Sequence, residues 1–156
     1  MQRSTVLLAA ALVAMASLAQ ADKKKELMPR YLKHTLECAK ELNAEVGVCK
    51  EMMKDGNDNS AEKYQPCKCV IACVAKKSKV MTESGEANAD AFTAAVDEFE
   101  IKEWSDEWQR VKPLCEPVVQ GKKDCVLGYD FFTCGYEKSE IFRDVIKKFI
   151  GGMDKS

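Results

Sequence analysis

The sequence predicts an all-α domain, a compact bundle of six to seven helices cross-linked by disulfides. Apolar side chains recur at helical spacing along most of the 156-residue chain, and no segment shows the alternation of a strand. Eight cysteines, an even number, follow an apolar N-terminal segment. This combination is typical of exported chains that fold in an oxidising compartment. We therefore expect a secreted, disulfide-stabilised helical protein.

The N-terminal segment, residues 1–21, is predicted to be a signal peptide. Arg3 supplies a positive charge, residues 6–19 are almost entirely apolar, and the chain then passes through Ala19-Gln20-Ala21, a small-x-small cleavage pattern. The apolar run is too short to span a ~30 Å bilayer core comfortably, and no later segment has enough consecutive apolar residues. We therefore expect a secreted protein without a membrane span, with residues 22–156 as a single domain.

Three helices are predicted in the first half of the mature chain. Charged and apolar residues recur at helical spacing over 26–42. A shorter helix over 44–54 ends where the polar segment 55–60 breaks the chain. That segment resembles a calcium-binding loop but has serine and proline where such a loop has its sixth-position glycine and twelfth-position glutamate. The third helix covers 66–79, since Pro66 suits a first helical turn.

Two further helices are predicted after a turn at 82–86. The first covers about 88–99. The second covers 103–119, where tryptophan, valine and cysteine residues recur with a period near 3.6. Pro113 and Pro117 are expected to bend or shorten this helix, because proline removes a helical hydrogen bond.

The last two predicted helices cover 123–136 and 139–150. The second of them is strongly amphipathic and is expected to end at Gly151-Gly152. Its apolar stripe consists of Ile141, Phe142, Val145, Ile146, Phe149 and Ile150.

Charge and motif content argue against several functional classes. The chain has 24 basic and 25 acidic residues, a formal net charge of −1, and no large basic cluster that would favour nucleic acid. It has no Cys-x-x-Cys pair, and its only histidine, His34, lies away from the cysteine cluster at 67–73, which argues against a zinc site. A Gly-x-Ser-x-Gly elbow and a Cys-Cys-x-x-His arrangement are absent from the sequence. We expect no enzymatic activity, no cofactor and no metal.

The spacing of six cysteines resembles that of the insect odorant-binding proteins, the family of pheromone- and general odorant-binding proteins. The six are Cys38, Cys69, Cys73, Cys115, Cys125 and Cys134. The stringent intervals are the three residues between the second and third of these and the eight between the last two. Residues 79–88 also resemble the family's turn between its third and fourth helices. The resemblance extends over essentially the whole mature chain up to the sixth of these cysteines.

The resemblance implies a disulfide framework. The family's interlocked pairing, transferred to this chain, is Cys38–Cys73, Cys69–Cys125 and Cys115–Cys134. Two cysteines, Cys49 and Cys67, depart from the six-cysteine pattern. With the family's pairing in place, we expect these two to form a fourth bridge. The alternatives are that one or both stay free thiols or form a bond between two chains.

The resemblance also implies a function. Six helices would surround an apolar pocket, and the protein would carry small hydrophobic ligands, such as odorants, pheromones or fatty-acid-like molecules, through extracellular fluid. The candidates for its lining, each of which could instead be an ordinary core residue, are Val74, Met81, Phe92, Val96, Trp108, Val111, Leu127, Phe131 and Phe132. Tyr129, Thr133 or Tyr136 could supply a hydrogen bond to a ligand.

The C-terminal helix and the partners admit alternatives. The helix over 139–150 would be a lid or a further wall of the pocket, or an ordinary packing helix. The resemblance allows a membrane receptor or a second copy in a homodimer as a partner. The alternatives to a transport carrier are a salivary or haemolymph scavenger of small mediators and a pocketless secreted structural or antimicrobial protein.

Overall fold

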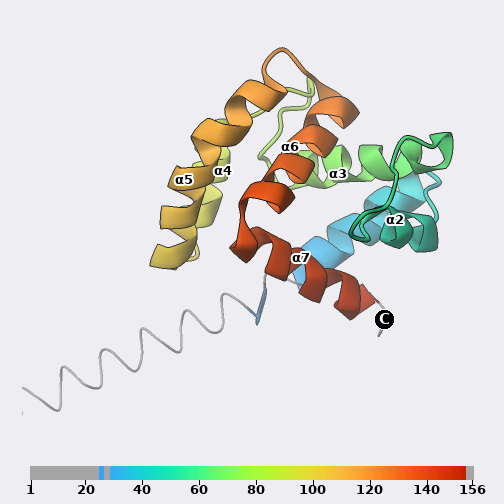
Figure 1. The fold of residues 1–156 in the computed structure, drawn as a ribbon, viewed down its shortest axis with the longest axis horizontal. Coiled ribbons are helices and arrows are strands. Elements are labelled where there is room, and N and C mark those ends of the chain that lie inside the picture. The colour runs from blue at the N-terminus through green and yellow to red at the C-terminus, as the bar shows by residue number, and fades with distance from the viewer. Residues whose placement is uncertain (1–24, 27–28, 154–156) are drawn as a thin grey trace, which may run out of the picture.

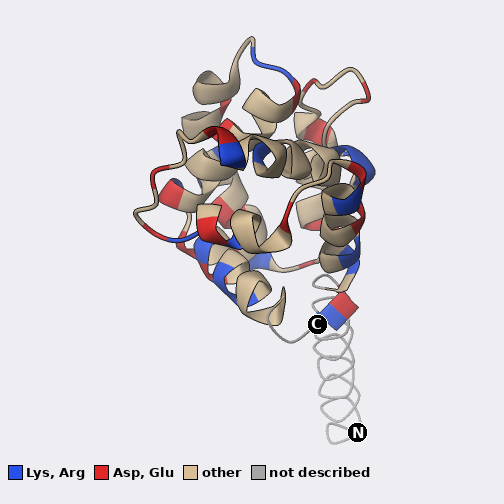
Figure 2. Ribbon diagram, turned by 90° about the vertical axis from the view of Figure 1, so that its right-hand side faces the viewer, with Lys and Arg blue, Asp and Glu red and all other residues tan. Residues whose placement is uncertain are grey.

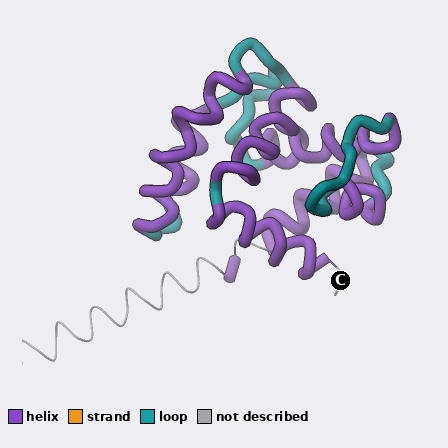
Figure 3. Tube along the Cα trace, in the orientation of Figure 1, coloured by secondary structure: helices purple, strands orange, loops and turns teal. Residues whose placement is uncertain are grey.

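The structure is a computed structural model that describes residues 25–26 and 29–153. The described part of the chain is all-α, as predicted, and its one β-type contact is an isolated antiparallel bridge between Met81 and Ala87. Helices make up most of the tube in Figure 3. The predicted signal peptide lies outside the described residues.

The predicted α-helices appear in the predicted order, and one short 3-10 helix was not predicted. The helices are residues 29–41, α2 (Val46–Met52), the 3-10 helix η1 (Glu62–Tyr64), α3 (Gln65–Lys77), α4 (Ala89–Asp97), α5 (Lys102–Val119), α6 (Asp124–Lys138) and α7 (Glu140–Met153). In Figure 1, α6 crosses α3 near the centre, with α4 and α5 on one side and α2 on the other. None of the described helices combines the length and apolar character that a membrane crossing requires.

Local capping determines where several helices begin. The Asn88 side chain precedes α4 and accepts a hydrogen bond of 3.1 Å from the amide of Ala91. Ser139 precedes α7, and its hydroxyl accepts a hydrogen bond of 3.1 Å from the amide of Phe142. Such side chains satisfy amides that have no partner inside the helix. Pro66 lies in the first turn of α3, as predicted.

The predicted shortening of α5 and the predicted end of α7 are not found. Pro113 and Pro117 lie inside α5 without shortening it. Residues Gln109 and Pro113, whose carbonyls lose their helical donors, are exposed, so water can replace those donors. Gly151 and Gly152 lie inside α7 rather than ending it. A glycine costs a helix about 1 kcal/mol relative to alanine, and the buried Phe149 anchors this end of α7 by packing.

The backbones of α3 and α6 lie close together where the two helices cross. A Cβ atom placed on Gly128 of α6 would lie 3.0 Å from the Cα and amide nitrogen of Ala72 on α3. A larger residue at this position would push the two backbones apart by a few tenths of an ångström, so glycine suits the crossing. The Cys69–Cys125 disulfide joins the same two helices one turn away, with 4.4 Å between its Cα atoms. Covalent and steric constraints therefore coincide at this crossing.

Four disulfides connect the helices into a frame. The bonds are Cys38–Cys73, Cys49–Cys67, Cys69–Cys125 and Cys115–Cys134, which are the pairs expected above. Three of them end on α3, which is thereby linked to the N-terminal helix, to α2 and to α6. The fourth links α5 to α6. Helices α4 and α7 contain no cysteine, so only non-covalent contacts hold them.

Most of the buried apolar residues fall into four small clusters, and three of these clusters include disulfide sulfurs. One contains Cys49 and Cys67, a second contains Cys38, and a third contains Cys115 and Cys134. The remaining cluster is purely apolar and lies between α3, α5 and α6; its members are Ala72, Met81, Val119 and Leu127. The half-buried Phe131 packs against this cluster and against the cluster of Cys115 and Cys134. Many apolar side chains between the clusters are only half-buried.

We expect Gly128→Ala to lower the free energy of unfolding by roughly 1–3 kcal/mol, because its methyl group would press against the α3 backbone. Denaturant unfolding with circular dichroism would measure this loss. Gly47→Ala is the matched control: Gly47 is also helical, and a Cβ there meets nothing within 4 Å. It should be neutral or slightly stabilising. Equal stability of the two variants would contradict the steric account of the crossing.

Candidate ligand-binding site

Three aromatic side chains from three helices meet beside the frame. Phe92 on α4, Trp108 on α5 and Phe131 on α6 form what we call the aromatic cluster. The ring centroids of Phe92 and Trp108 are 4.3 Å apart, those of Phe92 and Phe131 5.5 Å, and those of Trp108 and Phe131 6.0 Å. Trp108 is 7% exposed, whereas Phe92 and Phe131 are half-buried. The cluster therefore combines a fixed centre with two partly accessible rings.

Helical periodicity brings these rings together. On α5, Trp108, Val111 and Cys115 recur every three to four residues and are all buried. On α6, Phe131 lies one turn before Cys134 and on the same face. The disulfide between Cys115 and Cys134 holds these two faces against each other. Helix α4 then packs along α5 and adds Phe92 to the rings.

The polar atoms of the cluster have partners within the protein. The Trp108 indole Nε1 donates a hydrogen bond of 2.8 Å to the hydroxyl of Thr93. That hydroxyl donates in turn to the backbone carbonyl of Ala89, one turn earlier on α4, at 3.0 Å. Buried polar hydrogens are costly without such partners. Sequence reasoning did not find Thr93, because nothing in the pattern links it to a tryptophan on another helix.

Six of the nine predicted lining residues gather around Phe131. They are Met81, Phe92, Trp108, Val111, Leu127 and Phe131 itself. Phe131 packs against two core clusters, that of Ala72 and Leu127 and that of Cys115 and Cys134. The remaining three are Val74, Val96 and Phe132. Val74 packs against the cluster of Cys38. Val96 is half-buried on α4, and Phe132 faces α7.

A second aromatic group lies between α6 and α7. The ring of Phe132 meets that of Phe142 edge to face, with centroids 5.5 Å apart, and stacks on Tyr136 at 6.3 Å. Because Phe131 and Phe132 are neighbours on one helix, their side chains point in different directions. Helix α6 therefore carries aromatic rings toward α4 and α5 on one side and toward α7 on the other.

The three hydroxyls considered for ligand contact all have protein partners. Tyr129 accepts a hydrogen bond of 2.9 Å from the side-chain amide of Asn59. Tyr136 donates one of 2.6 Å to Asp55. Thr133 donates one of 2.9 Å to the backbone carbonyl of Tyr129, one turn earlier. These hydroxyls therefore connect parts of the protein to one another.

Arginine side chains fix the corner between α6 and α7. Arg143 of α7 donates to the carbonyls of Tyr136 and Glu137 at 3.0 and 3.1 Å. Arg110 of α5 donates to the carbonyl of Lys138 at 2.5 Å. These carbonyls end α6 and would otherwise have no helical partner. Arg143 therefore ties α7 to the end of α6, and Arg110 of α5 bonds that same end.

Further along α7, Asp55 links this helix to the loop after α2. Its carboxylate lies 3.2 Å from Lys147 of α7 and also accepts the hydrogen bond from Tyr136. The hydrogen bonds from Tyr136 and Lys147 lower the pKa of Asp55 below its ordinary value. Burial, aided by the hydrogen bond to Asp55, raises the pKa of Tyr136 to about 12. At neutral pH the contact therefore joins a carboxylate to a neutral phenol.

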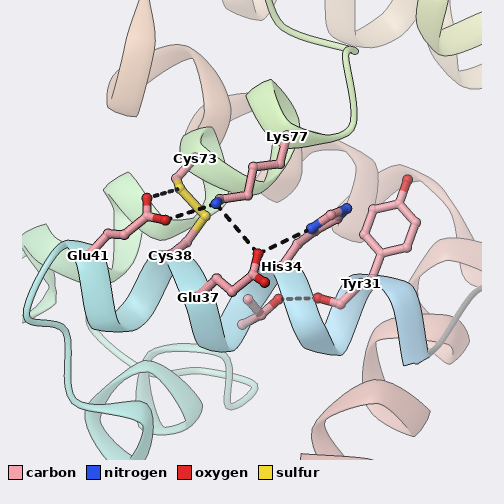
Figure 4. The surroundings of a disulfide bond; sticks show 8 residues. Tyr31, His34, Glu37, Cys38, Glu41, Cys73 and Lys77 are labelled. Carbon is pink, nitrogen blue, oxygen red and sulfur yellow. Dashed lines mark hydrogen bonds and ion pairs between the residues drawn. A yellow bond between two sulfur atoms is a disulfide. The ribbon is translucent and has the colours of Figure 1, made fainter.

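Charged side chains surround the Cys38–Cys73 disulfide. Figure 4 shows Lys77 reaching Glu41 at 2.8 Å and Glu37 at 3.5 Å across the gap between α3 and the N-terminal helix. Glu41 and the two sulfurs lie close enough together to resemble a metal site. Both sulfurs are bonded to each other, however, so they cannot act as thiolate ligands. The disulfide and the ion pairs around it therefore hold α3 against the N-terminal helix.

A charged cleft of about 510 Å³ lies where α5 meets the α6–α7 corner. It is lined by Glu107, Arg110, Glu137, Lys138, Glu140, Ile141 and Arg143. Only one of these side chains is apolar, so the cleft does not suit a hydrophobic ligand. Elsewhere, basic and acidic residues are interspersed along the helices (Figure 2).

Known proteins resemble this chain over much of its length. A profile of the PBP/GOBP family matches residues 20–138 of the chain. Among curated proteins, the chain is similar to general odorant-binding protein 19d of Drosophila melanogaster. The two are 28% identical over 107 residues, which cover 67% of this chain and 71% of that protein. No solved structure matches.

We expect Asp55→Asn to lower the melting temperature at pH 7, because it removes the charge that pairs with Lys147. The folded-state pKa of Asp55 is depressed, so its contribution to stability is present above the unfolded value of ~3.9 and is lost as pH falls through the folded value. Melting temperatures of the variant and the natural chain should therefore converge in acid. Asp144→Asn, on the exposed side of α7, is the control and should not reproduce this convergence. A pH-independent difference would exclude the proposed pairing.

Proposed function

The chain belongs to the PBP/GOBP family of insect odorant-binding proteins, and from this premise we propose that it is a secreted carrier of small hydrophobic ligands in extracellular fluid. Members of this family are ligand carriers and not enzymes. The four disulfides agree with an exported protein, because such bonds persist in oxidising compartments. Odorants, pheromones and fatty-acid-like molecules are the proposed ligand classes.

The observation that carries the proposal is the aromatic cluster. Its three rings come from three helices. Two of the rings, those of Phe92 and Phe131, are only half-buried. An apolar ligand that covers the exposed parts of these rings would remove apolar area from water, which stabilises the complex by about 25 cal/mol per Å². The neighbouring side chains of Met81, Val111 and Leu127 extend the apolar surface around Phe131. Methionine adapts to ligands of different shape.

We further propose that α7 is a separate apolar wall on the side of α6 opposite the aromatic cluster. Its apolar stripe points toward the rest of the protein. Only Phe149 of the stripe is buried, and its other apolar residues are half-buried. Phe142 of this stripe contacts Phe132 on α6. The arginine-capped corner holds the start of the helix, so α7 is better suited to a fixed wall than to a freely opening lid.

Displacement of the fluorescent apolar probe N-phenyl-1-naphthylamine tests the carrier function. We expect saturable binding at micromolar protein and displacement by apolar odorants. Phe92→Ala should weaken probe binding roughly tenfold, since loss of one ring contact removes on the order of 1–2 kcal/mol.

Phe99→Ala is the matched control for this experiment. Phe99 is another half-buried phenylalanine that packs on an α5 tryptophan, Trp104, with centroids 5.5 Å apart, but it is not part of the aromatic cluster. It should leave probe affinity within about twofold. Absence of a saturable site in the natural chain would reject the carrier function and favour a pocketless secreted protein. Equal losses in both variants would place the ligand elsewhere.

A further inference from the structure

We propose that Thr93 is a positioning residue that sets ligand specificity, by engaging the one N–H group of the aromatic cluster and so reserving the cluster for a hydrocarbon part of the ligand. The proposal rests on the carrier function proposed above and refines it, because it names the chemical group that the cluster accepts. A ligand carbonyl or hydroxyl would have to lie away from these rings.

The geometry leaves the cluster without a donor for a ligand. Phenylalanine rings carry no polar hydrogen, so the indole Nε1–H of Trp108 is the only such group among the three. That hydrogen is directed at the Thr93 hydroxyl, 2.8 Å away. The hydroxyl's own hydrogen is directed at the carbonyl of Ala89 at 3.0 Å. Both donors are therefore committed to α4.

The same hydrogen bond fixes the orientation of the indole. It ties Trp108 on α5 to the helix that carries Phe92, and the two rings lie 4.3 Å apart with their planes at 43°. Phe131 then meets both rings edge to face, at 72° and 67°. Such arrangements place ring edges against ring faces, which suits a further aromatic or aliphatic group.

A polar ligand atom placed on this surface would lose its water without gaining a partner. Sites whose polar groups are all satisfied internally discriminate against ligands that bring an unpaired acceptor. Removing the Thr93 hydroxyl should reverse this preference. The indole N–H would then lack its acceptor in an apolar environment and could donate to a ligand carbonyl.

The test uses two ligands of similar shape, of which only one has a hydrogen-bond acceptor. They are 2-isopropenylnaphthalene and 2-acetylnaphthalene, and in the second a carbonyl oxygen replaces the terminal methylene of the first. Their dissociation constants are measured by displacement of N-phenyl-1-naphthylamine from the natural chain and from Thr93→Val, Thr93→Ala and Thr93→Ser. The readout is the ratio of the two constants within each protein. Changes in overall stability or pocket size affect both ligands and largely cancel.

We expect the ratio to shift toward the ketone by about fivefold or more in Thr93→Val, since a neutral hydrogen bond changes affinity by roughly two- to tenfold. Thr93→Ala, which also lacks the hydroxyl, should shift the same way and provides the measurement if the valine variant does not fold. Thr93→Ser retains the hydroxyl and should keep the ratio of the natural chain. The indole N–H resonance of Trp108 should move on adding the ketone to Thr93→Val, but not on adding it to the natural chain.

The outcomes separate this inference from the carrier function. If the probe binds and is displaced but the ratio is the same in all four proteins, the role of Thr93 is refuted and the carrier function stands. If Thr93→Ser shifts as much as Thr93→Val, the hydroxyl is not the cause and the inference is refuted. If no probe binds to the natural chain, the carrier function fails, and the inference fails with it.

Discussion

The crossing of α3 and α6 is the constraint on which the rest of the structure depends. Gly128 allows the two backbones to touch at Ala72, and the Cys69–Cys125 disulfide holds them there. From α3, two more disulfides position α2 and the N-terminal helix, and from α6 another positions α5. Small buried clusters suffice for such a domain, because the cross-links limit the freedom of the unfolded chain.

The candidate site lies at the boundary between this frame and the helices that it does not include. The frame supplies Trp108 and Phe131 on helices held by the Cys115–Cys134 bond, whereas α4 adds Phe92 and Thr93 through side-chain contacts alone. On the other side of α6, α7 is attached in a comparable way, by arginine caps and aromatic contacts. A ligand at this boundary would contact Trp108 and Phe131, whose helices a disulfide joins, and also Phe92, whose helix has no disulfide.

Helical periodicity, which depends on short stretches of sequence, and a cysteine spacing shared with a known family predicted much of the fold. The helices appear near their predicted ranges because burial follows the helical repeat. The sequence predicted that α7 ends at Gly151, but the helix continues to Met153. The free energy that two glycines cost the helix is smaller than the free energy that packing of α7 contributes. The site was predicted only in part. The Thr93–Trp108 hydrogen bond joins residues on two helices, and no local pattern distinguishes Phe131, which belongs to the aromatic cluster, from Phe132, which contacts α7 instead.

The absence of cysteines from α4 and α7 also bears on how such a protein can diverge. Substitutions in α4, at Phe92 or Thr93, alter the surface offered to a ligand without touching a disulfide or the α3–α6 crossing. On the proposals made above, the α4 residues that would contact a ligand are thus separate from the cysteines and the glycine that hold the scaffold together. A changed side chain on α4 would therefore change the surface offered to a ligand and leave the four disulfides in place.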